Sequence, residues 1–265
     1  MKKLSLITLL IAMVAGIMAV EARTLIQPSK KNVTKTYKVS TFNELKVVSV
    51  YDVEYEQSTT NTWSLEITAP DNILPYVEVR RSGSSLILAL KKDLSTRGDY
   101  KLKAKIKAPA LEDVALGGAS SFKAGKINLA GREFEVGATG ASEIDIKTIV
   151  ASKFEVDLTG ASKLKVGSVS ANEIEADVTG ASEIDMRGVS AGNVGLKASG
   201  ASDIDLAGKA ETLSIKASGA SKVKTDGLRA SSGRLEASGA SDIKASVSNV
   251  LYQRASGAST IINKK

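Results

Sequence analysis

Cysteine and histidine, two amino acids that carry much of enzyme chemistry, are absent from the 265-residue chain. Without cysteine there is no disulfide, no thiolate ligand or nucleophile and no cysteine-linked lipid anchor, so we do not expect a lipoprotein. Without histidine there is no imidazole ligand and no catalytic triad built on an imidazole base. These absences favour a protein that is not an enzyme.

Aromatic residues are also scarce, at 4% of the chain, although 43% of the residues are hydrophobic. A core of Val, Ile, Leu and Ala suits thin, regularly stacked layers better than a bulky globule. The 36 basic and 29 acidic residues give a net charge of +7, but the two signs are interleaved along the chain. With no motif that reads a nucleic-acid groove, we expect a solvated surface and no nucleic-acid partner.

The first 22 residues have the pattern of a secretory signal peptide. Lys2 and Lys3 precede an apolar run over residues 4–20, and cleavage is expected after Ala22. The run is short for a membrane-spanning helix, which is the alternative interpretation. We therefore expect export to the periplasm, the cell surface or the medium, with no integral membrane span after cleavage.

The triplet Gly-Ala-Ser recurs eight times in the second half of the chain. Successive glycines are separated by 22, 20, 20, 20, 19, 20 and 18 residues. They are Gly118, Gly140, Gly160, Gly180, Gly200, Gly219, Gly239 and Gly257. A fixed period near 20 predicts stacked units that cannot bury their apolar faces alone.

Within each repeat, apolar and polar residues alternate on both sides of the glycine, which is typical of strands. Val156 and Leu158 precede Gly160, for example, and Leu164 and Val166 follow it. A third apolar column indicates a short third side, so that each coil would be a flattened triangle of short strands. We predict an all-β protein whose main part is a right-handed parallel β-helix, or solenoid, with about 20 residues per coil and about eight coils.

The glycine of each triplet is expected at a sharp corner of its coil. Gly140, Gly160, Gly180 and Gly200 would supply backbone freedom there, the alanine would fit a crowded corner, and the serine would stack on its own copies. As a catalytic motif the triplet makes no chemical sense, because eight copies of one nucleophile lack an evident base.

Outward-facing charges that follow the glycine mostly alternate in sign from coil to coil, which we interpret as a guard against a slip of one whole coil. The alternation breaks at four carboxylates on two adjacent coils, Glu183, Asp185, Asp203 and Asp205. Such a group suggests a site for Ca²⁺, which prefers carboxylate oxygens. A solvated acidic patch beside Lys165 and Lys224 is the favoured alternative, and no other cofactor is expected.

Residues 23–108 are rich in predicted strands but lack the 20-residue period. We expect a strand-rich N-terminal cap or small β-domain there, with the solenoid over residues 109–265 and Pro109 at the boundary. At the other end, Asn263 stands where an inward aliphatic residue is expected, which predicts that the stack stops.

Aromatic residues concentrate before residue 109, including the single tryptophan. Exposed aromatic side chains favour contacts with carbohydrates and proteins. Trp63, Tyr55 and Tyr51 are therefore the candidate ligand-binding residues, and packing of Trp63 in the core is the alternative.

Several segments together resemble the GIN domain family. They are Phe42, Val47 and Asp52-Val53, then WSLEI at 63–67, LIL at 86–88 and IKAPAL at 106–111, followed by the repeated Gly-Ala-Ser. That family, of Bacteroidetes type, is described as a putative autotransporter adhesin head domain of unknown function. The resemblance covers residues 40–262 and implies a β-helix-like fold, but it carries no active-site residues with it.

Three functions follow from these observations. The first is an exported, non-enzymatic, adhesin-like or ligand-binding surface head whose partner is a host or bacterial glycan or surface protein. The second is an envelope scaffold, in which chains stack end to end or pair side to side as a homo-oligomer. The third, a polysaccharide-active β-helix enzyme, is disfavoured because coils of nearly uniform length leave no long loops for a cleft.

Overall fold

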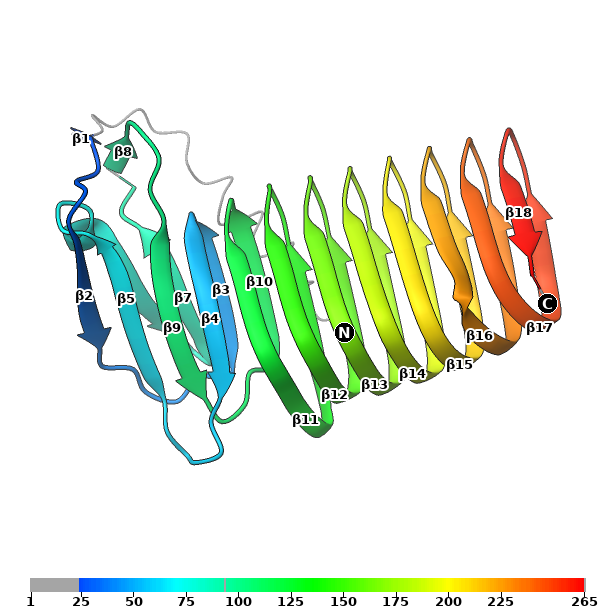
Figure 1. Ribbon diagram of the computed structural model, residues 1–265, viewed down its shortest axis with the longest axis horizontal. Coiled ribbons are helices and arrows are strands. Elements are labelled where there is room, and N and C mark those ends of the chain that lie inside the picture. The colour runs from blue at the N-terminus through cyan, green and yellow to red at the C-terminus, as the bar shows by residue number, and fades with distance from the viewer. Residues whose placement is uncertain (1–23, 93, 265) are drawn as a thin grey trace.

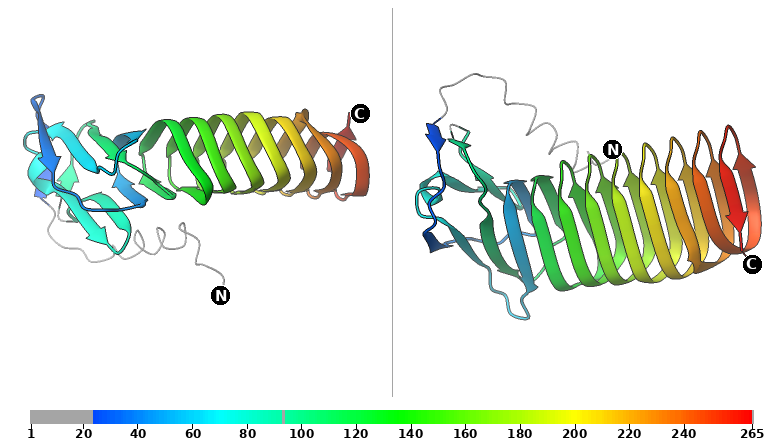
Figure 2. Two further views of the ribbon diagram at one scale, coloured as in Figure 1. Left: turned by 90° about the horizontal axis from the view of Figure 1, so that it is seen from below. Right: turned by 45° about the horizontal axis from the view of Figure 1, so that its top comes forward.

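The protein is described by a computed structural model that covers residues 24–92 and 94–264. The expected signal peptide lies outside these residues. Within them, no helix is long and apolar enough to cross a membrane. The rod-like molecule has an irregular cap at one end, followed by a regular stack of coils (Figures 1 and 2).

The cap contains short strands and one 3₁₀ turn. They are β1 (Thr24–Ile26), β2 (Asn32–Tyr37), β3 (Glu44–Ser49), β4 (Tyr51–Gln57), β5 (Ser64–Pro70), η1 (Leu74–Tyr76), β6 (Val77–Ser82), β7 (Ser85–Leu90), β8 (Leu94–Thr96) and β9 (Leu102–Ala108). β10 (Asp113–Gly118) then leads into the stack.

The stack consists of long strands, one for each coil. They are β11 (Ser121–Ala138), β12 (Glu143–Leu158), β13 (Lys163–Val178), β14 (Glu183–Ala198), β15 (Asp203–Ala217), β16 (Lys222–Ala237) and β17 (Asp242–Ala255), closed by the short β18 (Thr260–Asn263). Each pairs in parallel with the next, and Leu164 lies between Ile144 of the preceding coil and Ile184 of the following one. The all-β solenoid with about 20 residues per coil is therefore confirmed.

The shape of a coil differs from the predicted flattened triangle. Each coil is one continuous strand of 14 to 18 residues that bends, instead of two or three short strands. Figure 1 shows a narrow corner at one edge of the stack and a rounded bend at the other. The strand stays continuous because pairing persists through the bend, where Ile149 lies beside Val169.

The core of the stack is aliphatic, with inward residues of successive coils forming fully buried columns. The first coils add aromatic rings: Phe134 and Phe154 stack with their centroids 5.6 Å apart. A single hydrophobic cluster extends from Phe42 in the cap to Val247 in β17. The cap and the solenoid therefore share one core.

The narrow corner is formed by the Gly-Ala-Ser triplet. Gly160 has a φ of +76°, a region that favours glycine. A Cβ atom built on it would lie 2.7 Å from the carbonyl oxygen of Gly140 in the preceding coil. That oxygen accepts a hydrogen bond from the Ala161 amide at 2.8 Å, so the backbone ladder runs through the corner.

The serine of the triplet closes the corner from inside. Ser162 is buried, and its hydroxyl donates to the carbonyl of Thr159 at 2.9 Å. Ser142, Ser182, Ser202, Ser221 and Ser241 make the same bond to the residue three positions earlier. The repeated serine therefore satisfies a buried carbonyl, a role that the sequence prediction of stacked serines did not include.

The cap is joined to the stack by parallel pairing. β3 pairs with β10 and β7, and β4 pairs with β11 and β9, all in parallel. Antiparallel pairs then cover the outer end, with β2 against β5, β5 against β9 and β6 against β7. The cap thus continues the stack on one side and folds back on itself on the other.

Asn263 ends the ladder at the C-terminal end. Its side-chain amide accepts a hydrogen bond from the Val247 N–H at 2.8 Å and donates to the Val247 carbonyl at 2.9 Å. These are the two bonds that a further strand would make with Val247. The side chain therefore occupies a position at which another β-strand could pair.

Candidate binding site

The structure separates the three aromatic residues that the sequence placed together. Tyr51 and Tyr55 are core residues, 0% and 5% exposed. Their hydroxyls donate to the carbonyls of Ala89 and Ala108, each at 3.0 Å. Burial raises the pKa of both phenols. This corrects the expectation of a ligand-binding surface for these two residues, because each packs its ring inward and satisfies its hydroxyl internally.

Trp63 lies at the surface end of the same core. It is half-buried, and its indole N–H donates to the Phe42 carbonyl at 3.1 Å. One side of the residue lines an open hollow of about 490 Å³ between the cap and the first coil. We call this the Trp63 hollow; its other lining residues include Phe42, Asn43, Arg81, Glu112 and Arg132.

Polar groups of the Trp63 hollow are held by internal bonds. Glu112 accepts from Arg132 Nη1 at 2.6 Å and from Asn43 Nδ2 at 2.9 Å. On the other side, Arg81 Nη1 donates to Ser40 Oγ at 2.6 Å. Two guanidinium groups and an amide are therefore fixed around a tryptophan ring, an arrangement that can bind a ligand with little loss of side-chain freedom.

Arg132 reaches the hollow because the first full coil is longer than the others. Between Leu129 and Glu133, β11 has two more residues than the matching part of β12. Gly131, with a φ of +80°, turns the chain at this bulge. The 22-residue spacing from Gly118 to Gly140 is the sequence signal for this insertion. The spacing predicts a longer coil but does not by itself indicate a binding site.

The chemistry of the hollow suits binding. An indole ring offers a face on which a sugar ring or an aromatic group can stack. Guanidinium groups form paired hydrogen bonds with carboxylates, sulfates or phosphates. Among the described lining residues Glu112 is the one carboxylate, and it is already bonded to Arg132 and Asn43. The lining residues therefore present donors and an aromatic wall.

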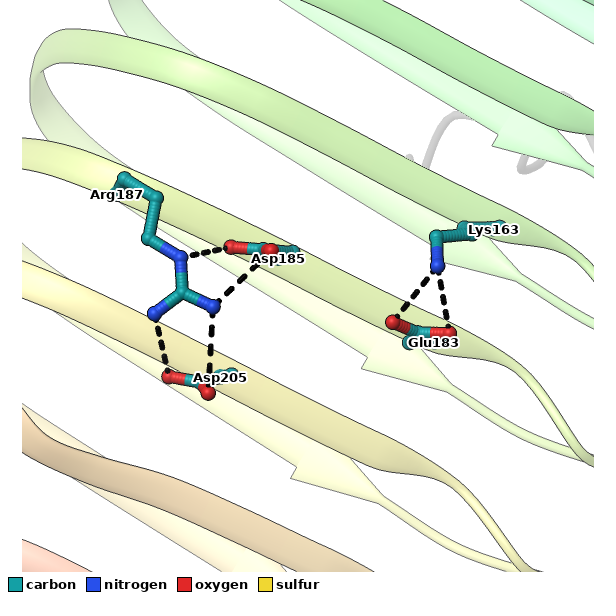
Figure 3. Close-up of polar contacts among 5 residues, drawn as sticks. All are labelled: Lys163, Glu183, Asp185, Arg187 and Asp205. Atoms are coloured by element: carbon teal, nitrogen blue, oxygen red, sulfur yellow. Dashed lines mark hydrogen bonds and ion pairs between the residues drawn. The ribbon is translucent and has the colours of Figure 1, made fainter.

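The four carboxylates proposed for calcium lie as the repeat predicts, with Glu183 beside Asp203 and Asp185 beside Asp205. Figure 3 shows that Arg187 lies between the second pair. Its guanidinium is 2.6 Å from an Asp185 oxygen and 3.4 Å from an Asp205 oxygen. The hydrogen bond with Asp185 and the two negative charges raise the pKa of Arg187.

The other two carboxylates also have cationic neighbours. Lys163 contacts Glu183 at 2.9 Å, and Lys224 lies 3.9 Å from Asp203. Across the part of the chain that the structure describes, no group of three or more His, Cys, Asp or Glu residues is placed to hold a metal ion. The calcium site stays a sequence-based prediction without support from this geometry, because Arg187 occupies the space between Asp185 and Asp205.

Replacing Arg187 with glutamine should destabilise the solenoid more at low salt than at high salt. The change leaves Asp185 and Asp205 side by side without their shared cation, and exposed pairs of this kind contribute about 0.2–1 kcal/mol each. We expect a loss of about 1 kcal/mol in urea melts at low ionic strength and a smaller loss in about 0.5 M salt. Arg229→Gln, at another exposed arginine, is the control; an equal loss at both salt concentrations would contradict the interpretation.

Solved structures with the same fold include proteins from two Parabacteroides species. A putative adhesin from Parabacteroides merdae superposes with a TM-score of 0.82 and 20% identity, covering 91% of this chain and 99% of that one. A putative adhesin from Parabacteroides distasonis gives 0.80 and 22%, covering 91% and 100%. A protein from P. distasonis described as a putative lipid binding protein gives 0.80 and 17%, again covering 91% and 100%. At these identities the likeness shows the fold.

No curated protein matches the sequence. The model of one protein family does match, over residues 41–202 and again over 166–265, which together span the cap from β3 onward and every Gly-Ala-Ser repeat. The family is described as a putative auto-transporter adhesin, head GIN domain. This match confirms the resemblance seen in the sequence, and the chain belongs to the GIN domain family.

Proposed function

We propose that this chain is an exported, non-enzymatic binding head that holds an acidic carbohydrate of a host or bacterial surface in the Trp63 hollow. The observation that carries the proposal is the fixed arrangement of Arg81 and Arg132 around Trp63 at the cap end of a rigid rod. An adhesin-like role is also how the family is described.

The class of ligand follows from the groups that line the hollow. A pyranose ring has an apolar face that stacks on indole, and its hydroxyls bond to amides such as that of Asn43. A carboxylate or sulfate on the sugar would pair with the guanidinium of Arg132 or Arg81. A neutral sugar would offer no negative charge to the remaining donors of these cations, so acidic saccharides should bind more tightly.

The alternatives have less support from the geometry. An enzyme would need a general acid and base beside the ligand, and Glu112 is engaged by Arg132 and Asn43. A scaffold that grows by end-to-end stacking would need β17 and β18 to pair with another chain, and the Asn263 amide already bonds to Val247 at that edge. Binding of a surface ligand in the Trp63 hollow is compatible with the contacts of Glu112 and with those of Asn263.

Substitution of Arg132 should weaken binding without unfolding the rod. The experiment screens residues 23–265 against an array of neutral and acidic glycans, matrix proteins and lipid vesicles. For the best acidic glycan we expect Arg132→Ala to weaken binding by about 10- to 100-fold, the effect of losing a charged hydrogen bond. Trp63→Phe should weaken it less, because a ring remains.

Arg229→Ala, far from the hollow on the bend of β16, is the matched control and should bind like the wild type. Binding that Arg132→Ala leaves unchanged would reject the Trp63 hollow as the site. Binding only to proteins or lipid vesicles would reject an acidic carbohydrate as the ligand.

A further inference from the structure

Each coil presents two broad sides, one before and one after the rounded bend. The side formed by the second half of strands β11–β17 carries three outward columns of side chains; we call it the return face. One column consists of Glu135, Glu155, Glu175, Gly195, Ser214 and Arg234. The next consists of Asp157, Asp177, Lys197, Lys216, Glu236 and Arg254.

Charge on the return face is polarised along the rod. The columns are acidic over β11–β13 and mainly basic over β14–β17, where Glu236 is the exception. The third column adds Glu133 and Glu173 to the acidic part. Within this acidic part, Lys153 is the one cation in the three columns. Lys153 contacts Glu155 at 3.2 Å and Glu175 at 2.5 Å. Its hydrogen bond to Glu175 raises the pKa of Lys153.

Apart from the ion pairs of Lys153 and the pair of Lys216 with Glu236 at 3.8 Å, this distribution does not stabilise a single chain. Like charges directly opposite on neighbouring strands are unfavourable, and the ladder places Glu155 beside Glu175 and Asp157 beside Asp177. On the other broad side, charges mostly alternate, as the contact of Lys163 with Glu183 illustrates. The return face therefore has a charge pattern that its own fold does not explain.

A glycine that the fold does not require lies at the middle of the return face. Gly195 on β14 is in extended backbone without a positive φ. The nearest heavy atoms to an added Cβ would be 3.9 Å away, on Glu175 and Ile174. Glycine weakens a strand interior, and it often marks a place where another backbone approaches closely. An open hollow of about 380 Å³ lies over this position.

We propose that the return face binds a second copy of this chain in antiparallel orientation, with the twofold axis passing near Gly195. A twofold axis at β14 brings β13 opposite β15 of the partner subunit and β12 opposite β16, because the coils are evenly spaced. Asp177 then faces Lys216 of the partner subunit, and Glu155 faces Arg234 of the partner subunit. Each mainly acidic half meets a mainly basic half, except that Asp157 faces Glu236 of the partner subunit, and both ends of the interface gain the same contacts.

The expected affinity is modest and depends on salt. The three columns over seven strands cover roughly 30 Å by 20 Å, or about 600 Å² for each copy. The total, about 1,200 Å², is at the lower limit for a stable interface. We therefore expect a dimer with a dissociation constant in the micromolar range that weakens as salt screens the exposed charges.

Charge reversal tests the proposal by sedimentation velocity on residues 23–265. One variant carries Glu155→Lys and Asp177→Lys, and the other carries Lys216→Glu and Arg234→Glu. Each variant alone should be monomeric, because the substituted positions then face side chains of like charge on the partner subunit. An equimolar mixture of the two should form dimers again, since opposite faces then meet. Combining all four substitutions in one chain should also restore the dimer.

A matched control separates the effect of charge on the return face from the effect of net charge. Lys165→Glu with Lys222→Glu changes the charge by the same amount on the other broad side and should leave the dimer intact. Gly195→Leu should weaken the dimer by about tenfold or more while the monomer stays folded by circular dichroism. A wild type that stays monomeric up to about 1 mM at low salt, forms polymers, or resists both charge reversals would overturn the proposal.

Discussion

Gly160→Ala should lower the stability of the solenoid far more than the substitution of a surface residue. The left-handed backbone at φ +76° costs an alanine about 1–2 kcal/mol. Its Cβ would also press against the Gly140 carbonyl oxygen, 2.7 Å away. That oxygen cannot move without losing its bond to the Ala161 amide. Together these effects should lower the free energy of unfolding by about 3 kcal/mol or more.

The measurement is urea unfolding followed by far-UV circular dichroism. Gly125→Ala is the matched control, since this strand glycine in β11 has no positive φ and no atom within 4 Å of an added Cβ. It should be neutral or slightly stabilising, because alanine restricts the unfolded chain. Equal stability of the Gly160 and Gly125 variants would mean that the corner tolerates a side chain.

Phe154→Ala should cause a loss of similar size by a different mechanism. The ring is fully buried on β12 and stacks on Phe134 at 5.6 Å. Its removal leaves a cavity between coils that cannot close, because the backbone spacing is fixed by the ladder. Such substitutions cost about 3–5 kcal/mol. Phe154→Leu should recover part of the loss by refilling the volume.

A substitution at the end of the stack provides the contrast. Ile261 on β18 is half-buried and packs against the same core. Ile261→Ala should cost about 1 kcal/mol, because a terminal coil contacts one neighbour and an inner coil contacts two. Comparable losses at positions 154 and 261 would show that the solenoid does not behave as a stack of neighbouring units.

Much of the solenoid could be predicted from the sequence because the same spacing of about 20 residues applies to every coil. The spacing of the glycines determines which residues are neighbours in successive coils, so Glu183 beside Asp203 followed directly from counting. The alternation of apolar residues likewise identified inward columns such as Ile149 and Val169. The bend was harder to predict, since one continuous strand and two short strands have the same alternation of apolar and polar residues.

The surroundings of single side chains could not be predicted by counting. Arg187 follows Asp185 by two positions, which places it on the same outward side, but only the fold shows its guanidinium against Asp205 as well. In the cap no repeat was available, so tyrosines of the core and a tryptophan at the surface looked alike. Tyr51 and Trp63 differ in the strands that cover them, which come from distant parts of the sequence.

The ladder that runs through every corner also determines how the rod would respond to pulling. Its hydrogen bonds lie across the strands and therefore point along the rod. A force between the Trp63 hollow and the C-terminus would load one coil interface at a time, beginning at β18, instead of shearing the whole sheet at once. Each detached coil of about 20 residues would release about 70 Å of extended chain. The molecule would then lengthen in steps under tension while the cap, at the far end, kept its shape.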